Sequence, residues 1–209
     1  MHLILSLLAT VLIQGTWSVS TQAGGTQLDL RYETPTSNSS HSAHVDPNAL
    51  GIAAALASPG AHVHFTLHHE AGDLVCDGWV ASGSGGGTYT FTPNTAFVDA
   101  MQHRGYDVRS IDEQMAAANL DITTEYVDSF ERIKFHPSDF HGLVAMKALN
   151  VTSDYVALFQ AAGVDDLTSQ NVIALKAMRV DATYLKHLQT DGFKNLSAHE
   201  IIRLKAQNI

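Results

Sequence analysis

The chain has 209 residues, of which 45% are hydrophobic and 16% charged, and its 21 acidic residues outnumber 12 Lys and Arg for a net charge of −9 with histidine neutral. This composition excludes a disordered chain. The negative charge, without a basic stripe, argues against a nucleic-acid-binding protein. The single cysteine, Cys76, excludes an intrachain disulfide framework and a multi-cysteine zinc site. The length allows one or two domains with a sizeable core.

An apolar run covers residues 3–13 near the amino end. The run is too short for a membrane-spanning helix and fits the size of a signal-peptide core, although Met1-His2 before it contains no Lys or Arg. Thr21 and Ala23 are small residues suited to a cleavage site after Ala23. We therefore expect residues 1–23 to be a signal peptide and the protein to be secreted or periplasmic. The alternative is that the run forms a buried first strand or helix of the fold.

Residues 27–92 predict a small antiparallel β domain. Apolar and polar residues alternate in the expected strands, which are residues 27–34, residues 61–70, the segment around Cys76 and residues 88–93. Between them we expect a loop over residues 37–48, a short helix or buried connection over residues 50–57, and a flexible Gly-rich turn over residues 82–87. Alternation places Cys76 on one face with Leu74 and Val80, which predicts a small buried hydrophobe and not a reactive thiol.

The carboxyl half repeats with a period of 29 residues. One position of this period is always apolar and another is always aromatic: Pro93, Ile122, Val151, Val180 and Ile209 occupy the first, and Phe97, Tyr126, Tyr155 and Tyr184 the second. Thr, Ser or Asp residues suited to helix N-caps begin each half of a repeat, and Gly105, Gly163 or Gly192 ends the first helix. Lys134 stands at the glycine position of the second repeat, where we expect a strained or differently built turn.

We predict an α+β protein in which the sheet is followed by four helix-turn-helix repeats, at residues 93–121, 122–150, 151–179 and 180–208. A single helical hairpin cannot bury both of its apolar stripes, so the repeats should stack into a short α-solenoid or bundle. The aromatic position is expected to pack in the core, and an exposed ladder for a ligand is the alternative. Gln114 and Ala117 replace large apolar residues in the first repeat, a divergence expected of an end unit.

These repeats, as in TSDYVALFQAAGVDDLTSQNVIALKAMRV, resemble a degenerate bacterial repeat with a T-x-x-aromatic-V start and an L-[ST] start to the second helix. The repeat occurs in the extracytoplasmic carboxyl-terminal regions of some beta-lactam-sensor-type membrane metallopeptidases and in secreted bacterial proteins. The preceding segment is similar as well, through its Ala71-Gly72 turn, Gly-rich hairpin and Phe91-x-Pro93 junction. The resemblance covers about residues 61–209. It implies an exported accessory module without the peptidase part.

The sequence offers one weak candidate for a metal-binding site. His62, His64 and His68 share one face of an expected strand, at a spacing compatible with a surface metal clamp, but no acid or cysteine at ligand spacing completes the set. A solvated strand face or a pH-sensitive patch are the alternatives. The zinc-peptidase pattern H-E-x-x-H fails at both near matches, because Asp73 and Arg203 replace the second histidine. We predict no catalytic residue and no cofactor.

Lys147, Lys176 and Lys205 occupy one position of the repeat and are candidate partner-binding residues, with a merely solvated row as the alternative. Repeat arrays present extended surfaces that commonly bind proteins. We therefore predict an exported, non-catalytic interaction or sensing module that binds a protein or cell-envelope component through its helical repeats. A metal-dependent hydrolase using the histidine-rich strand and a structural spacer are the alternatives. No nucleic-acid partner and no transmembrane helix in the mature form are expected.

Overall fold

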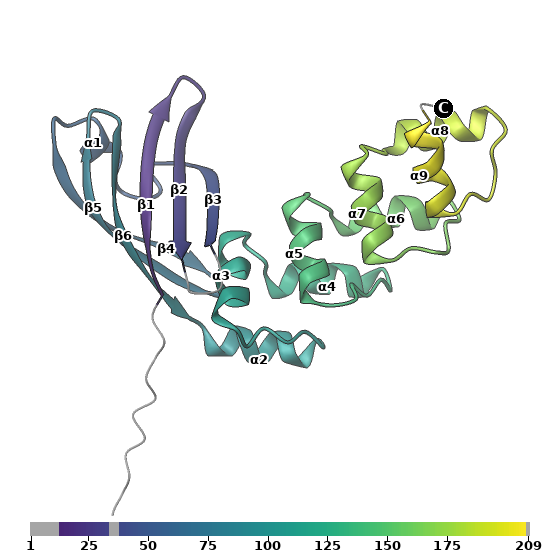
Figure 1. The fold of residues 1–209 in the computed structure, drawn as a ribbon, viewed down its shortest axis with the longest axis horizontal. Coiled ribbons are helices and arrows are strands. Elements are labelled where there is room, and N and C mark those ends of the chain that lie inside the picture. Colours follow the sequence, from purple (N-terminus) through teal and green to yellow (C-terminus); the bar gives the residue numbers. More distant parts are fainter. Residues whose placement is uncertain (1–12, 34–37, 208–209) are drawn as a thin grey trace, which may run out of the picture. The chain divides into compact units, whose positions relative to one another are not determined.

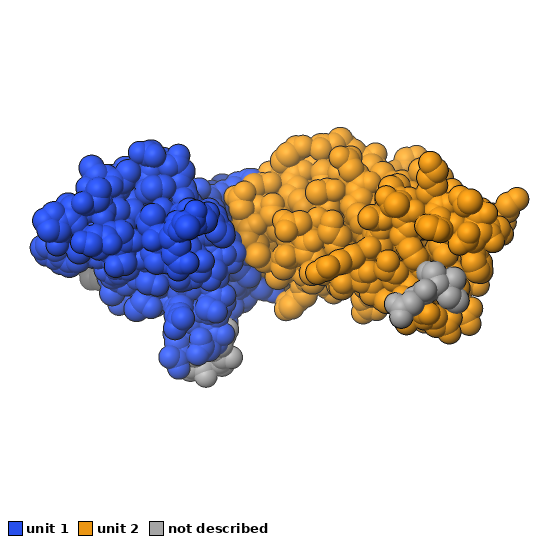
Figure 2. Space-filling view, turned by 90° about the horizontal axis from the view of Figure 1, so that it is seen from above, with its two compact units in different colours: residues 1–97, 109–119 blue, residues 98–108, 120–209 orange. Residues whose placement is uncertain are grey.

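The computed structural model describes residues 13–33 and 38–207 (Figure 1). In this part of the chain it contains a six-stranded antiparallel sheet and nine helices, which confirms the predicted α+β class. The chain divides into two compact units, coloured separately in Figure 2. The described residues up to 97, together with residues 109–119, form the first, and residues 98–108 with those from 120 onward form the second.

The sheet has the strand order β3-β2-β1-β6-β5-β4, and every neighbouring pair is antiparallel. Its strands are β1 (Ile13–Gln22), β2 (Gly25–Glu33), β3 (Asn38–Val45), β4 (Ala61–His69), β5 (Gly72–Ala81) and β6 (Ser84–Pro93). Alternate residues of five of these strands are buried on one face, as period-two patterns predict. A short helix, α1 (Ala53–Leu56), contacts β4 and β5. It lies within residues 50–57, where a helix or buried connection was expected.

The described part of the sheet begins at Ile13, and not at residue 27, where the β domain was expected to begin. Strand β1 pairs with β2 on one side and β6 on the other, and it buries Trp17 and Val19. A mature chain starting after Ala23 would lack this central strand, which conflicts with the sheet. The first part of the predicted signal peptide, residues 1–12, lies outside the described residues.

Two segments predicted as loop or turn are strands. β3 occupies most of the expected loop over residues 37–48, and none of its side chains is buried; it is held by backbone pairing along β2. Of the expected turn over residues 82–87, only Ser82 and Gly83 form the turn, both with positive φ, and the later glycines belong to β6. A Cβ on Gly87 would collide with the Asp77 carbonyl, so the glycine run permits close strand packing.

Trp17 is buried on one face of the sheet and contacts residues of β4 and β5. Its Nε1 donates to the Asp77 carbonyl at 3.1 Å, and its ring meets Phe65 edge-on at a centroid distance of 5.1 Å. Cys76 is a free thiol fully buried on the same face as Leu74, which confirms the prediction of a small buried hydrophobe. Burial raises the pKa of the Cys76 thiol to about 12, so the thiol stays protonated and unreactive at neutral pH.

The eight remaining helices of the described chain form pairs whose bounds recur along the sequence. They are α2 (Thr95–His103), α3 (Ile111–Asn119), α4 (Thr124–Arg132), α5 (Phe140–Ala148), α6 (Ser153–Ala161), α7 (Ser169–Ala177), α8 (Ala182–Thr190) and α9 (Ala198–Ala206). Each has nine residues. The N-caps recur too: Thr123, Thr152 and Asp181 each accept a hydrogen bond from the backbone N–H of the tyrosine three residues later.

The turn after α4 is built like its counterparts, contrary to the expectation of a different turn at Lys134. Lys134 N donates to the Glu131 carbonyl at 2.9 Å, as Gly163 N does to the Gln160 carbonyl at 3.0 Å after α6. Both residues lie in the left-handed region, with φ of 56° for Lys134 and 80° for Gly163. The strain part of the expectation holds at Lys134, because a side chain in this region costs about 1–2 kcal/mol.

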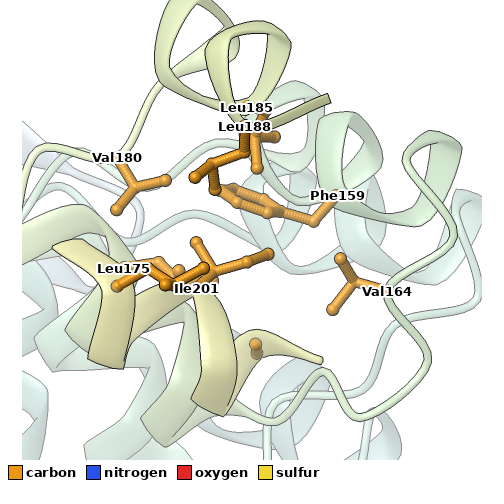
Figure 3. Close-up of a cluster of buried hydrophobic side chains, with 9 residues drawn as sticks. Phe159, Val164, Leu175, Val180, Leu185, Leu188 and Ile201 are labelled. Atoms are coloured by element: carbon orange, nitrogen blue, oxygen red, sulfur yellow. The ribbon is translucent and has the colours of Figure 1, made fainter. Parts of the chain in front are cut away.

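Buried apolar side chains connect consecutive helix pairs in the second unit. Helix α5 contacts α7, and α7 contacts α9. In the last two pairs the Phe159 ring lies between Leu185 and Leu188 on one side and Leu175 and Ile201 on the other (Figure 3). Helix α3 is different because it packs on β5 and β6 in the first unit. Gln114 and Ala117 are buried on this helix, at positions where the later pairs have larger apolar residues.

Candidate functional site

The three lysines predicted as partner-binding residues form one row on the helices. Lys147, Lys176 and Lys205 occupy the same position of α5, α7 and α9, which contact one another in that order. Each ammonium lies over the ring of a tyrosine on the preceding helix, with Nζ-to-centroid distances of 4.7 Å to Tyr126, 4.5 Å to Tyr155 and 4.1 Å to Tyr184. We call these three residues the lysine row.

The tyrosines below the lysine row link one helix pair to the next. Tyr126 Oη donates to the Val151 carbonyl at 2.9 Å, and Tyr155 Oη donates to the Val180 carbonyl at 2.8 Å. Each ring also meets a buried phenylalanine one turn later edge-on, at centroid distances of 5.0 and 5.1 Å. Burial raises the pKa of both tyrosines, so the hydroxyls remain protonated donors at neutral pH.

The tyrosines also restrict the lysine side chains. All three lysines are half-buried, and a cation over an aromatic face gains about 0.5–2 kcal/mol. Restricted side chains lose less conformational entropy when they bind a partner. The arrangement therefore holds three positive charges at the same position of three helices, and it also stabilises each helix pair. The aromatic position packs as expected, with its rings partly buried and not displayed as a free ladder.

His62, His64 and His68 of β4 are exposed on the solvent face of the sheet. His62 Nε2 lies 3.1 Å from Asp77 Oδ1, and His64 Nδ1 lies 3.4 Å from Asp77 Oδ2. His68 has a different partner, Asp73, at 3.0 Å. The hydrogen bond from His62 is the main reason that the pKa of Asp77 lies below its usual value, so the carboxylate stays charged.

This arrangement does not form the metal clamp considered for His62, His64 and His68. Two of the histidines share one carboxylate and the third pairs elsewhere on the strand. Among residues 13–33 and 38–207, no group of three or more His, Cys, Asp and Glu side chains is placed to hold a metal ion. The described part of the site therefore gives no support to a metal-dependent hydrolase.

Sequence reasoning missed the acid and the aromatic residue beside these histidines. Asp77 lies opposite His64, and Trp79 lies opposite His62, in the register of β4 with β5. The Trp79 side chain is 65% exposed and meets the His62 ring edge-on at 5.2 Å. Both residues lie on the face of β5 opposite Cys76, and the register that brings them to the histidines depends on the hairpin turn.

None of the described helices is both long enough and apolar enough to cross a membrane. Comparisons of the chain with protein-family models, with characterised proteins and with solved structures found no match. The interpretation of these surfaces therefore depends on their geometry and chemistry.

Proposed function

We propose that the chain is an exported, non-catalytic interaction module that binds an acidic segment of a protein or cell-envelope component through the lysine row. In this proposal residues 93–121, 122–150, 151–179 and 180–208 are four copies of one helical hairpin, stacked in a short solenoid. The recurrence of helix bounds, N-caps and Lys–Tyr pairs supports this interpretation.

The observation that carries the proposal is the fixed position of the three ammonium groups on contacting helices. Each lysine ammonium lies over the ring of a partly buried tyrosine, and the same geometry recurs from α5 to α7 to α9. A row of equally placed cations complements an extended partner that carries several carboxylates or phosphates. Such contacts chiefly govern association rate and specificity, and they weaken as salt screens the charges.

Export is proposed from the apolar run at residues 3–13 and from the resemblance to extracytoplasmic bacterial repeats. In this proposal the leader ends before Ile13, the first residue of β1.

The test is capture of partners from a cell-envelope extract by the full chain and three variants. Lys147, Lys176 and Lys205 are replaced together by Gln in the first variant and by Arg in the second. The matched control replaces Arg132, Lys134 and Lys186 by Gln, which removes three exposed positive charges away from the row. Circular dichroism confirms that each variant is folded.

We expect the wild-type chain, the Arg variant and the matched control to capture the same partner, and the Gln variant at the lysine row to lose it. Capture that is equal in the Gln variant would overturn the role of the row. A wild-type chain that captures nothing above a heat-denatured control would instead favour the structural spacer.

A further inference from the structure

A pocket of about 300 Å³ lies in the last two helix pairs, between the end of α6, helix α8 and the loop from α8 to α9. Its walls include the apolar side chains of Val164, Leu185, Leu188 and Ile201, all of which are buried from solvent. Lys194 is the only charged residue among those that line it. A volume of this size lies at the small end of the range for ligand pockets.

The residues of the preceding helix pairs explain why space remains here. Twenty-nine residues earlier in the sequence, Ala162 and Val164 correspond to Ile133 and Phe135, and Leu188 corresponds to Phe159. Phe135 is buried, with its ring centroid 5.9 Å from that of Phe130. At these three positions the later junction has the smaller side chain, which leaves room for the pocket. Leu185, Phe193 and Ile201, although larger than Val156, Val164 and Val172, leave the pocket open.

The polar rim of the pocket also differs from its counterpart. Gln160 Nε2 donates to the Ile133 carbonyl at 3.1 Å, whereas the side-chain amide of Gln189, at the matching position, has no hydrogen bond to a described residue. Asp165 corresponds to Lys194, so the sign of the charge is reversed. Gln189 and Lys194 are both exposed and line the pocket. The rim therefore offers an amide and a cation beside an apolar interior.

We propose that this pocket binds an acyl carboxylate, with the aliphatic chain between Val164, Leu185 and Leu188 and the carboxylate at Lys194 and Gln189. The apolar walls favour burial of the aliphatic chain, because its methylene groups are removed from water. The ammonium of Lys194 and the amide of Gln189 can both donate to the carboxylate oxygens. This site does not depend on the lysine row, because none of the three row residues lines the pocket.

The test is titration of the full chain with octanoate, followed by calorimetry and by two-dimensional NMR of the backbone amides. Octylamine serves as a ligand of similar length with the opposite charge. Val164→Phe fills the pocket with the residue found at the earlier junction, and Ala162→Ile is a second filling variant. Lys194→Gln removes the charge at the rim and leaves the pocket open. Thermal unfolding checks the fold of each variant.

We expect saturable octanoate binding that shifts the amides of Phe193 and Leu196, at least about tenfold tighter than octylamine binding. Either filling variant, if folded, should weaken octanoate binding at least about tenfold, and Lys194→Gln should remove the preference over octylamine. The proposal is overturned if octanoate does not bind saturably, if a folded filling variant binds it as the wild-type chain does, or if octylamine binds equally well.

Discussion

Tyr155 donates its hydroxyl hydrogen to the Val180 carbonyl at 2.8 Å, and this bond joins helix α6 to the segment between α7 and α8. The same tyrosine carries Lys176 over its ring. The Tyr155 side chain therefore contacts the second helix of its own pair through Lys176. Through Val180 it also contacts the segment just before the next pair.

Replacing Tyr155 by Phe should destabilise the protein by about 1–2 kcal/mol, because the buried Val180 carbonyl loses its donor while the ring under Lys176 is kept. Lys176→Met removes the cation and should cost about 0.5–1 kcal/mol. Urea unfolding of both single variants and the double variant measures the two contributions and any coupling between them. Equal stability of Tyr155→Phe and the wild-type chain would rule out the hydroxyl as a link between pairs.

Replacing Lys134 by Gly should stabilise the protein by about 1 kcal/mol, because glycine adopts a positive φ without the steric cost borne by a side chain. Gly163→Ala is the mirror experiment, and it should destabilise the protein by a similar amount. Midpoints of thermal unfolding that move in opposite directions would confirm that both residues end a helix in the same way. A lower midpoint for Lys134→Gly would show that the lysine side chain makes a compensating contact.

Deletion of residues 1–23 should prevent cooperative folding of the sheet, because it removes β1 with Trp17 and Val19 from the core. Loss of a buried tryptophan alone costs about 3–5 kcal/mol. Deletion of residues 1–12 retains β1 and should leave cooperative unfolding intact. Near-ultraviolet circular dichroism and denaturant titration distinguish the two chains. Normal folding of the chain that lacks residues 1–23 would instead support cleavage after Ala23.

The ion pair between Arg104 and Asp128 should make stability depend on pH in the acid range. Arg104 Nε and Nη2 donate to the two carboxylate oxygens at 2.6 and 2.8 Å, and this bonding lowers the pKa of Asp128. Below the ordinary value of 3.8, the unfolded chain binds a proton at Asp128 before the folded chain does. The stabilisation is therefore complete above 3.8 and is lost as the pH falls through the lower folded pKa.

Asp128→Asn should accordingly be less stable than the wild-type chain at pH 7, with a gap that narrows below pH 3.8. The effect should be modest because the pair is partly exposed. Asp165→Asn, at an exposed loop position, is the control for the loss of one negative charge. A gap between Asp128→Asn and the wild-type chain that is constant across the titration would contradict this assignment.

The helices were anticipated from recurring apolar positions and N-cap residues in the sequence, and the bounds of α2 to α9 recur in the structure. Cys76 was predicted correctly because alternation depends only on neighbouring residues. Strand β1 was missed because its start overlaps an apolar run that also resembles a signal-peptide core. β3 was missed because its small polar residues carry no apolar alternation, and its pairing with β2 stabilises it.

The candidate surfaces were harder to predict because they depend on contacts between elements. The lysines were identified from the period, but their positions over Tyr126, Tyr155 and Tyr184 require two helices to pack together. Asp77 joins His62 and His64 only through the register of β4 with β5. The pocket beside Val164 depends on the sizes of side chains at one helix junction. Those sizes can be compared only once the structure shows which residues meet there.

The most direct test of the central claim is the affinity of the full chain for a fluorescent poly-glutamate peptide, measured by anisotropy at several salt concentrations. The account predicts saturable binding that weakens with salt, is kept when Lys147, Lys176 and Lys205 become Arg, and is lost when they become Gln. Binding that is equally strong in the Gln variant, or no binding by the wild-type chain at low salt, would contradict it.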